Sequence, residues 1–162
     1  MTSISIRPAT PDDAEMIAGM LSRLADEIGD TERFSSTAET IRQHGFGKQP
    51  LFHCLVAGRE TPDMGLALFF PIFSTTRAKP GVYVQDLWMA KDARGQGLGR
   101  RLLAEIVSYS AMQWDAAYLS LTVYASNTNA TAFYQNIGFD EGHDDVAMAL
   151  DGDAFDRLRG QL

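Results

Sequence analysis

The residues that most clearly indicate a ligand-binding function form a glycine-rich segment, Arg94-Gly95-Gln96-Gly97-Leu98-Gly99-Arg100. It follows an apolar run, Val82 to Met89, and precedes apolar residues at helical spacing, so it is expected to connect a strand to a helix. Glycines let the backbone approach a ligand closely, and the first turn of a helix leaves N–H groups unpaired at its positive end. A pyrophosphate is the natural ligand of such a turn.

Two better-known nucleotide motifs are not present in this segment. The dinucleotide-binding fingerprint requires a third glycine where Arg100 stands, and the P-loop requires Gly-Lys-Ser or Gly-Lys-Thr, which the sequence lacks. The pattern present is Arg-x-x-Gly-x-Gly, from Arg94 to Gly99. A glycine-rich turn without a ligand is the alternative explanation of this spacing.

Strand and helix periods alternate around this segment, which predicts an α/β or α+β layered fold. No repeat or linker interrupts the pattern, so residues 1–162 are expected to form a single domain. The expected strands are 4–7, 52–57, 65–70, 82–89, 118–123 and 146–150. The expected helices are 11–28, 37–45, 98–114 and 129–137, the second of them opening on a capping box at Ser36 to Glu39.

Composition narrows the possible partners. The 162 residues contain 14 Lys and Arg against 21 Asp and Glu, and the net charge of −7 argues against nucleic acid or an anionic membrane surface. The single cysteine excludes a disulfide framework, and the three histidines have no ligand spacing, so no metal is predicted. The N-terminal residues do not resemble a secretion signal, and a cytoplasmic protein is expected.

At the Arg94–Gly99 pattern the chain resembles the GNAT acetyltransferase superfamily, whose acyl-CoA pyrophosphate loop carries it. The resemblance extends over residues 4–150 and looks like the spermidine/spermine and thialysine acetyltransferase branch. The segments that carry it are Gly45-Phe46-Gly47, Phe52 to Ala57, Lys79 to Tyr83, Asp86-Leu87, the Arg94 loop and Phe133-Tyr134.

The resemblance implies a mixed, mostly antiparallel sheet with helices on both faces and a splay between the fourth and fifth strands. Acetyl-CoA would lie in that splay, with the backbone of residues 87–89 pairing with its pantetheine arm and the N–H groups of residues 96–100 holding its pyrophosphate. Trp88 could equally be a core residue. The residues assigned to the co-substrate are Leu87, Trp88, Met89, Arg94, Gly95, Gln96, Gly97, Leu98, Gly99, Arg100 and Asn127.

Tyr134 is the catalytic acid that the resemblance implies. It would protonate the departing CoA thiolate, and the ordinary pKa values of a phenol and a thiol, about 10 and 8.5, make that transfer modestly uphill. A tyrosine that packs at the edge of the core beside Phe133 is the alternative.

The acceptor amine must lose a proton before it attacks. A lysine-like ammonium has a pKa of about 10.4, so forming the neutral amine at pH 7 costs roughly 4.6 kcal/mol. The branch usually has an acid where this chain has Gln85, and glutamine cannot accept that proton. Asp86 is retained and is the candidate for binding the cation or relaying its proton; a structural carboxylate at a strand end is the alternative.

Acids between the first two expected helices are candidates for acceptor binding. The branch places cation-binding acids in this region, and Glu27 and Asp30 are assigned here together with Gln85 and Asp86. Asp26 and Glu32 lie in the same cluster, and a solvated charged loop is the alternative for each of these acids.

The function expected from the resemblance is direct acetyl transfer from acetyl-CoA to a primary amine of a polyamine, a diamine or a lysine-like amino acid. The alternatives are an acetyltransferase for an aminoglycoside or a protein N-terminus, and a catalytically silent acyl-CoA-binding module, which the glutamine at position 85 would favour. The branch forms homodimers, so a two-fold partner is expected.

Overall fold

The computed structural model of the chain describes residues 3–142 and 145–160, and these fall into two compact units, residues 1–127 and 128–162. The first unit contains the whole sheet and the helices α1 to α3. The second contains α4 (Thr128–Ile137) and α5 (Gly152–Arg159).

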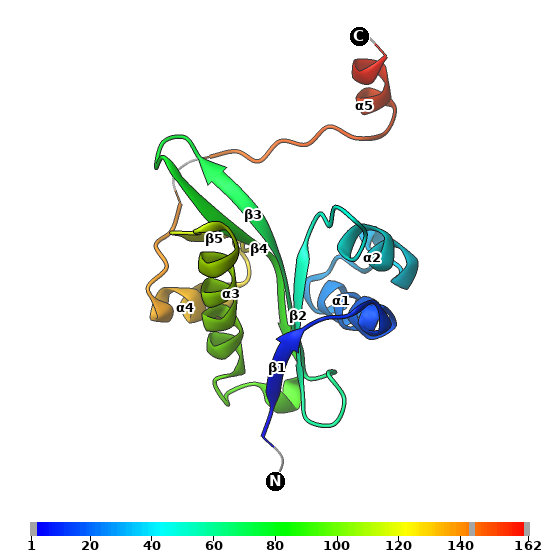
Figure 1. Cartoon of the computed structure of the whole chain (residues 1–162). Coiled ribbons are helices and arrows are strands. Elements are labelled where there is room, and N and C mark those ends of the chain that lie inside the picture. The colour runs from blue at the N-terminus through cyan, green and yellow to red at the C-terminus, as the bar shows by residue number, and fades with distance from the viewer. Residues whose placement is uncertain (1–2, 143–144, 161–162) are drawn as a thin grey trace. The chain divides into compact units, whose positions relative to one another are not determined.

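The sheet of the first unit has five strands in the order β1-β2-β3-β4-β5 (Figure 1). Neighbouring strands are antiparallel except for the pair β4–β5, which is parallel. The strands are β1 (Ser5–Pro8), β2 (His53–Gly58), β3 (Gly65–Ser74), β4 (Lys79–Met89) and β5 (Leu119–Leu121). The mixed, mostly antiparallel sheet expected from the sequence is therefore confirmed.

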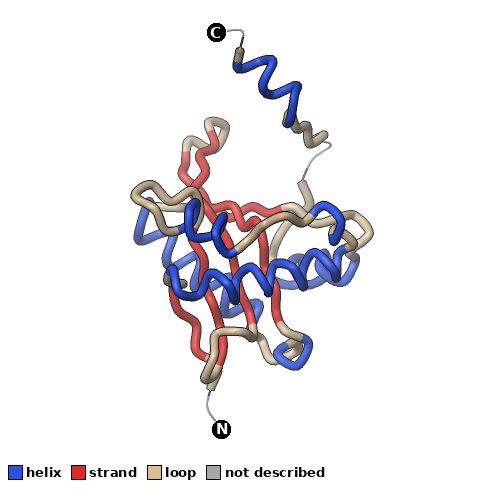
Figure 2. Tube along the Cα trace, turned by 90° about the vertical axis from the view of Figure 1, so that its right-hand side faces the viewer, coloured by secondary structure: helices blue, strands red, loops and turns tan. Residues whose placement is uncertain are grey.

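Helices α1 (Ala14–Ile28) and α2 (Ala38–Gly45) cover one face of this sheet. In Figure 2, which is viewed from their side, both lie in front of the strands. The apolar stripe of α1 packs on alternate residues of the strands, because side chains along a strand point to opposite faces in turn. The buried residues of this layer are Ala14, Ile17, Met20, Leu21, Ile41, Cys54, Val56, Leu66, Leu68 and Trp88.

An ion pair fixes the start of α1 to the edge of the sheet. The Asp13 carboxylate accepts hydrogen bonds from the Arg7 guanidinium at 2.7 and 2.8 Å and from the Thr10 N–H at 2.7 Å. These donors favour the charged carboxylate and lower the pKa of Asp13 to about 2, against the opposing effect of burial.

Helix α3 (Leu98–Trp114) lies on the opposite face, as Figure 1 shows, so helices cover both faces as expected. Leu98, Leu102 and Ile106 of this helix are fully buried. Gly65 of β3 allows the helix to approach closely, because a Cβ there would lie 3.2 Å from the Leu98 side chain.

The sequence predictions differ from the structure at several places. Strand β3 continues beyond the expected end at residue 70 to Ser74, β4 begins at Lys79 rather than at residue 82, and β5 spans residues 119–121 of the expected 118–123. Residues 146–150, expected as a strand, have no regular secondary structure, and α5 was not predicted. The cap of α2 is Thr37 with Thr40, rather than Ser36 with Glu39, because the Thr37 hydroxyl accepts from the Thr40 N–H at 3.2 Å. Within the described residues, no helix has the length and apolar character that a membrane crossing requires.

Gly81, at the start of β4, provides a test of how β4 and β5 begin to pair. A Cβ at Gly81 would lie 2.5 Å from the Tyr118 ring, and the Val82 N–H donates to the Tyr118 carbonyl at 2.9 Å. Gly81→Ala should therefore lower the free energy of unfolding by about 1–3 kcal/mol, because the ring must move. Thermal and denaturant unfolding would measure the change.

Gly19→Ala is the matched control. No atom lies within 4 Å of a Cβ at Gly19, which is exposed in the middle of α1. Alanine should stabilise the protein there by about 0.5–1 kcal/mol. Equal effects of the two substitutions would mean that the Tyr118 ring does not constrain Gly81.

Candidate functional site

Strand β4 changes its pairing in the middle, and this change creates the candidate site. Residues 82–84 pair with β5, and within the described residues the ladder ends there, although β4 continues to Met89. The outer edge of residues 85–89 is therefore left without a β5 partner, at the splay expected between the fourth and fifth strands. An extended ligand with amide groups could pair with such an edge.

A β-bulge lies at the same point. Phe69 of β3 pairs with Val84 and Leu68 with Asp86, which leaves Gln85 as the extra residue. Because a bulge inserts one extra residue, each residue beyond it lies on the opposite face of the sheet from the one it would otherwise occupy. Asp86 consequently lies in register with Leu68 on the α1 face, whereas Val84 lies in register with Phe69 on the α3 face. Gln85 itself is exposed.

Asp86 is a half-buried carboxylate without a partner: no hydrogen bond or ion pair connects it to any other residue that the structure describes. Burial disfavours the charged carboxylate and raises the pKa of Asp86 to about 6. A carboxylate with a pKa near neutrality, next to an open strand edge, is suited to accept a proton from an ammonium group.

Cys54 lies in the same row of the sheet, in register with Leu68. It is 7% exposed, and burial raises the pKa of its thiol to about 12, with further contributions from the charges of Asp86 and Asp13. The thiol stays protonated at neutral pH and is a core residue rather than a nucleophile.

The glycine-rich segment connects the end of β4 to α3 through a short 3₁₀ turn, Lys91–Ala93. Gly95 and Gly97 have φ of +74° and +76°, values that other residues rarely adopt. Gly97 is the N-cap of α3, no side chain caps this helix, and no acid lies in its first turn. The start of α3, a helix of 17 residues, is thus a positive helix end that no acidic side chain caps, which suits an anionic ligand.

Side chains of the loop fix its shape. The Gln96 amide donates to the Asp92 carbonyl at 2.6 Å, and the Arg94 Nε donates to the Met89 carbonyl at 2.9 Å. Arg101 donates to the Ile4 carbonyl at 2.8 Å and so connects α3 to the strand edge. The loop is thus pre-formed before a ligand binds.

Arg94 also forms an ion pair that sequence analysis did not predict. Its Nη2 lies 2.6 Å from Oε2 of Glu27, at the end of α1, and Oε1 of Glu27 accepts from the Trp88 indole N–H at 3.2 Å. The sequence analysis assigned Glu27 to acceptor binding and Arg94 to co-substrate binding. In the structure, these two side chains form an ion pair with each other. Trp88 is buried at 4% exposure, as the alternative reading of this residue expected.

Asp30 is connected to the segment after β5. It accepts a hydrogen bond from the Tyr124 hydroxyl at 2.5 Å and pairs with Arg33 at 3.3 Å. The hydrogen bond to Asp30 raises the pKa of Tyr124. Asp30 thus lies near the ends of α1 and β5. Asn127, three residues further along, donates its backbone N–H to the Tyr124 carbonyl at 2.8 Å.

Tyr134 belongs to the second unit. It lies on α4 between two aromatic neighbours, with ring centroids 5.1 Å from Phe133 and 5.3 Å from Phe139. Burial raises the pKa of Tyr134 to about 12, so the phenol carries its proton at neutral pH.

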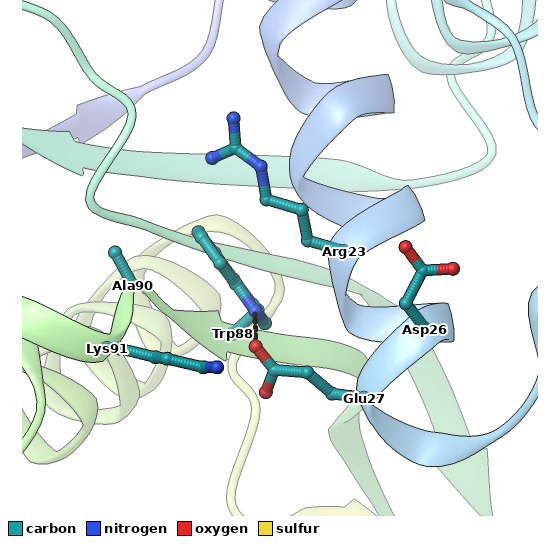
Figure 3. Close-up of a pocket in the computed structure, with 6 residues that line it drawn as sticks. All are labelled: Arg23, Asp26, Glu27, Trp88, Ala90 and Lys91. Carbon is teal, nitrogen blue, oxygen red and sulfur yellow. Dashed lines mark hydrogen bonds between the residues drawn. The ribbon is translucent and has the colours of Figure 1, made fainter.

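Three side chains near these residues were missed by sequence analysis: Arg23, Lys91 and Tyr124. Arg23 and Lys91 line an open pocket with Asp26, Glu27, Trp88 and Ala90 (Figure 3). No sequence signal pointed to these three residues, but one was available for the inward position of Glu27, which follows Met20 and Leu24 at helical spacing on the apolar stripe of α1. No group of three or more potential metal ligands occurs in residues 3–142 and 145–160.

Comparisons with known proteins agree with this arrangement. The model of the acetyltransferase (GNAT) family matches residues 20–139. A thialysine N-epsilon-acetyltransferase from Sus scrofa is 27% identical over 172 aligned positions, covering 99% of this chain and 100% of the relative. The L-ornithine N5-acetyltransferase NATA1 of Arabidopsis thaliana is 30% identical over 94 positions, covering 58% of this chain and 41% of that protein.

A solved structure supports the fold. The integron cassette protein VCH_CASS6 from the mobile metagenome of V. cholerae superposes with a TM-score of 0.77 at 18% identity, covering 98% of this chain and 99% of that one. The family match includes the parted strands β4 and β5, the glycine-rich loop and α4. The chain belongs to the GNAT acetyltransferase family.

Proposed function

We propose that the protein transfers an acetyl group from acetyl-CoA directly to a primary amine of a small cationic acceptor. The observation that carries this proposal is the parting of β4 from β5 after Val84, with the uncapped helix α3 at one end of the open edge. The relatives named for thialysine and ornithine support an amine acceptor of this class.

Acetyl-CoA fits the groups present. The free edge of residues 87–89 offers N–H and carbonyl groups to the pantetheine amides, and the N–H groups of residues 96–100 suit its pyrophosphate. Arg94 serves here by holding the loop, since its guanidinium is already bound to Glu27 and to the Met89 carbonyl.

In the proposed reaction, Asp86 accepts the proton of the bound ammonium and the neutral amine attacks the thioester carbonyl. The carbon–sulfur bond then breaks, and the thiolate takes a proton from Tyr134. The amide nitrogen releases its second proton, which returns through solvent to the tyrosinate. The raised pKa of Tyr134, about 12, keeps its proton available but makes it a weaker acid. Its contribution would therefore come from a positioned hydrogen bond to the sulfur as negative charge develops.

A catalytically silent acyl-CoA-binding module is the second candidate, because Gln85 occupies the exposed bulge where the branch has an acid. An acetyl-CoA consumption assay over polyamines, diamines, lysine analogues and aminoglycosides separates the two. Release of CoA with an amine supports the enzyme, whereas tight CoA binding without turnover supports the silent module.

We also infer a homodimer. The support for it is the resemblance to the spermidine/spermine and thialysine acetyltransferase branch, whose members form homodimers. A cytoplasmic location stays a prediction from the composition.

Gly97→Val tests the pyrophosphate loop. Valine is strained at φ +76°, and its branched side chain would occupy the space that the ligand needs, so CoA should bind at least tenfold more weakly, about 1.4 kcal/mol. Gly29→Val imposes a similar strain at φ +83°, at the end of α1, and should leave CoA affinity unchanged. Calorimetry on the folded variants measures both, and equal affinities would remove the loop assignment.

Tyr134→Phe tests the catalytic acid. The substitution keeps the ring contacts with Phe133 and Phe139 and removes only the hydroxyl. We expect kcat to fall by roughly 10²–10⁴-fold with little change in CoA affinity, because the lost interaction belongs to the transition state. Tyr118→Phe, at the residue before β5, is the control and should keep the wild-type kcat. Full activity of Tyr134→Phe would exclude the assignment.

Asp86→Asn should make the protein more stable but a poorer enzyme. Because the pKa of Asp86 is raised from 3.8 to about 6, the folded state binds this proton more tightly, and the carboxylate lowers stability progressively as pH rises from about 4 to 6. The asparagine variant should thus unfold at a higher temperature than wild type above pH 6 and at the same temperature below pH 4. Its KM for the amine should rise because the cation loses a partner, and its kcat should fall because asparagine cannot accept the proton. Asp63→Asn, at an exposed carboxylate, should change neither property.

Gln85→Glu restores an acid at the bulge. Asp86, with a pKa of about 6, is a far weaker base than an amine of pKa about 10.4, so the neutral amine stays scarce at pH 7 and the rising limb of the wild-type kcat profile should lie above pH 7. The variant should shift that limb to lower pH. A profile that does not move would show that position 85 is not within reach of the amine.

A further inference from the structure

The end of α1 contacts both sides of the place where β4 and β5 part. On the β4 side, Glu27 accepts a hydrogen bond from the Trp88 indole at 3.2 Å, as Figure 3 shows. On the other side, the Tyr124 hydroxyl donates to Oδ2 of Asp30 at 2.5 Å, and Tyr124 lies three residues beyond the end of β5. The end of α1 and the turn after it therefore span the parted strands on one face of the sheet.

Hydroxyl groups line the β5 side of the parting on this face. Ser120, Thr122 and Tyr124 alternate with apolar residues along β5 and the segment after it. The Tyr83 hydroxyl donates to Oγ1 of Thr122 at 2.9 Å. Tyr83 lies on the α1 face, because its neighbour Val84 lies on the α3 face. The contacts of Thr122 and Tyr124 thus place both side chains on the α1 face.

Asp86 lies on the β4 side of the parting and on the same face. It is in register with Leu68, which belongs to the core beneath α1. Acetyl-CoA would use other groups, namely the free edge of residues 87–89 and the start of α3, a helix on the opposite face (Figure 1). An amine that reaches Asp86 from the α1 face therefore approaches between Asp86 and the hydroxyls, near the Asp30–Tyr124 contact.

Both oxygens of the Asp30 carboxylate have partners. Oδ2 accepts from Tyr124, and Oδ1 pairs with Nη1 of Arg33 at 3.3 Å. The Asp30 backbone N–H donates to the Ala25 carbonyl at 2.8 Å, so the turn that carries this carboxylate is held in place. The Tyr124 side chain is 47% exposed. Its hydroxyl is a neutral donor that can leave the carboxylate for water.

We propose that Tyr124 holds the place of a second ammonium group of the acceptor: its hydroxyl occupies Asp30 in the free protein and gives way when an acceptor with an ammonium at each end binds. This inference rests on the proposed function, which places the reacting amine at Asp86. The second ammonium offers Asp30 a charged donor where tyrosine offers a neutral one. Tyr124 thereby weakens acceptor binding, because each such acceptor must first displace its hydroxyl.

Matched acceptors and the two partners of this hydrogen bond test the inference. Pentylamine is cadaverine without its second amine, and ε-aminocaproate is lysine without its α-amine. Tyr124→Phe frees Asp30 and should lower KM for cadaverine and lysine about fivefold, and leave KM for pentylamine and ε-aminocaproate unchanged. Asp30→Asn removes the charge and should raise KM for cadaverine and lysine about tenfold. The two partners of one hydrogen bond should thus have opposite effects.

Tyr109→Phe is the matched control. It also removes a tyrosine hydroxyl that has a partner, since the Tyr109 hydroxyl lies 3.3 Å from Nδ1 of His53, but it does so on α3. It should leave KM for all four acceptors at the wild-type value.

Fluorine NMR of protein labelled with fluorotyrosine gives a readout without turnover. The Tyr124 signal is identified by its absence from the spectrum of Tyr124→Phe. It should shift when cadaverine or lysine binds, and stay in place when CoA, pentylamine or ε-aminocaproate is added. A shift with cadaverine or lysine but no acetylation of any amine would support the displacement of Tyr124 and reject the proposed function.

Two results would overturn the inference and leave the proposed function intact. KM for cadaverine and lysine could stay the same or rise in Tyr124→Phe, as expected for a hydrogen bond that only stabilises the site. Alternatively, the Tyr124 signal could stay in place while cadaverine or lysine is acetylated. Neither binding nor acetylation of any of the four amines would reject both proposals.

Discussion

Strand β4 pairs with β3 along its length but with β5 over only three residues, and the other parts of the site depend on this difference. The free edge that results is next to the start of α3. One ligand can therefore place an extended part along this edge of β4 and a phosphate group at the start of the helix. The bulge at Gln85 then turns Asp86 toward α1 and away from α3. Without that extra residue, Asp86 would lie on the same face as Val84.

Asp13 and Asp86 show that environment, rather than residue type, sets the chemistry of a carboxylate. Asp13 is the more buried of the two, yet donors from Arg7 and Thr10 lower its pKa to about 2, and it connects β1 to α1. Asp86 has no donor among the described residues, and burial alone raises its pKa to about 6. The first carboxylate stabilises the fold, whereas the second is suited to an incoming cation.

Local patterns were predicted well from the sequence, and contacts between distant residues were not. The glycine-rich loop is a local motif, and the apolar stripe of α1 is a local periodicity, so both could be recognised. The Arg94–Glu27 contact joins residues 67 positions apart, and the Tyr124–Asp30 contact joins residues 94 positions apart. Helix and strand periods extend over only a few residues, so they cannot predict such contacts.

Residues 146–150 alternate between apolar and other residues as in a strand. Alternation indicates only which side of a strand each side chain would face, whereas a strand also needs a neighbouring strand to pair with. Helix α5 was missed because Phe155 and Leu158 are too few apolar residues to define a stripe.

Glu27 has partners in two parts of the site, Trp88 in the pocket and Arg94 in the loop. An anion that draws Arg94 away would free one oxygen of Glu27 and make the pocket more negative. The affinity of the pocket for a charged ligand would then change once the loop is filled. Thermodynamic linkage makes this coupling reciprocal, so a ligand bound in the pocket would change the affinity of the loop for its anion by the same factor. Cooperativity between the two substrates, and a preferred order of their addition, would then depend on a single carboxylate.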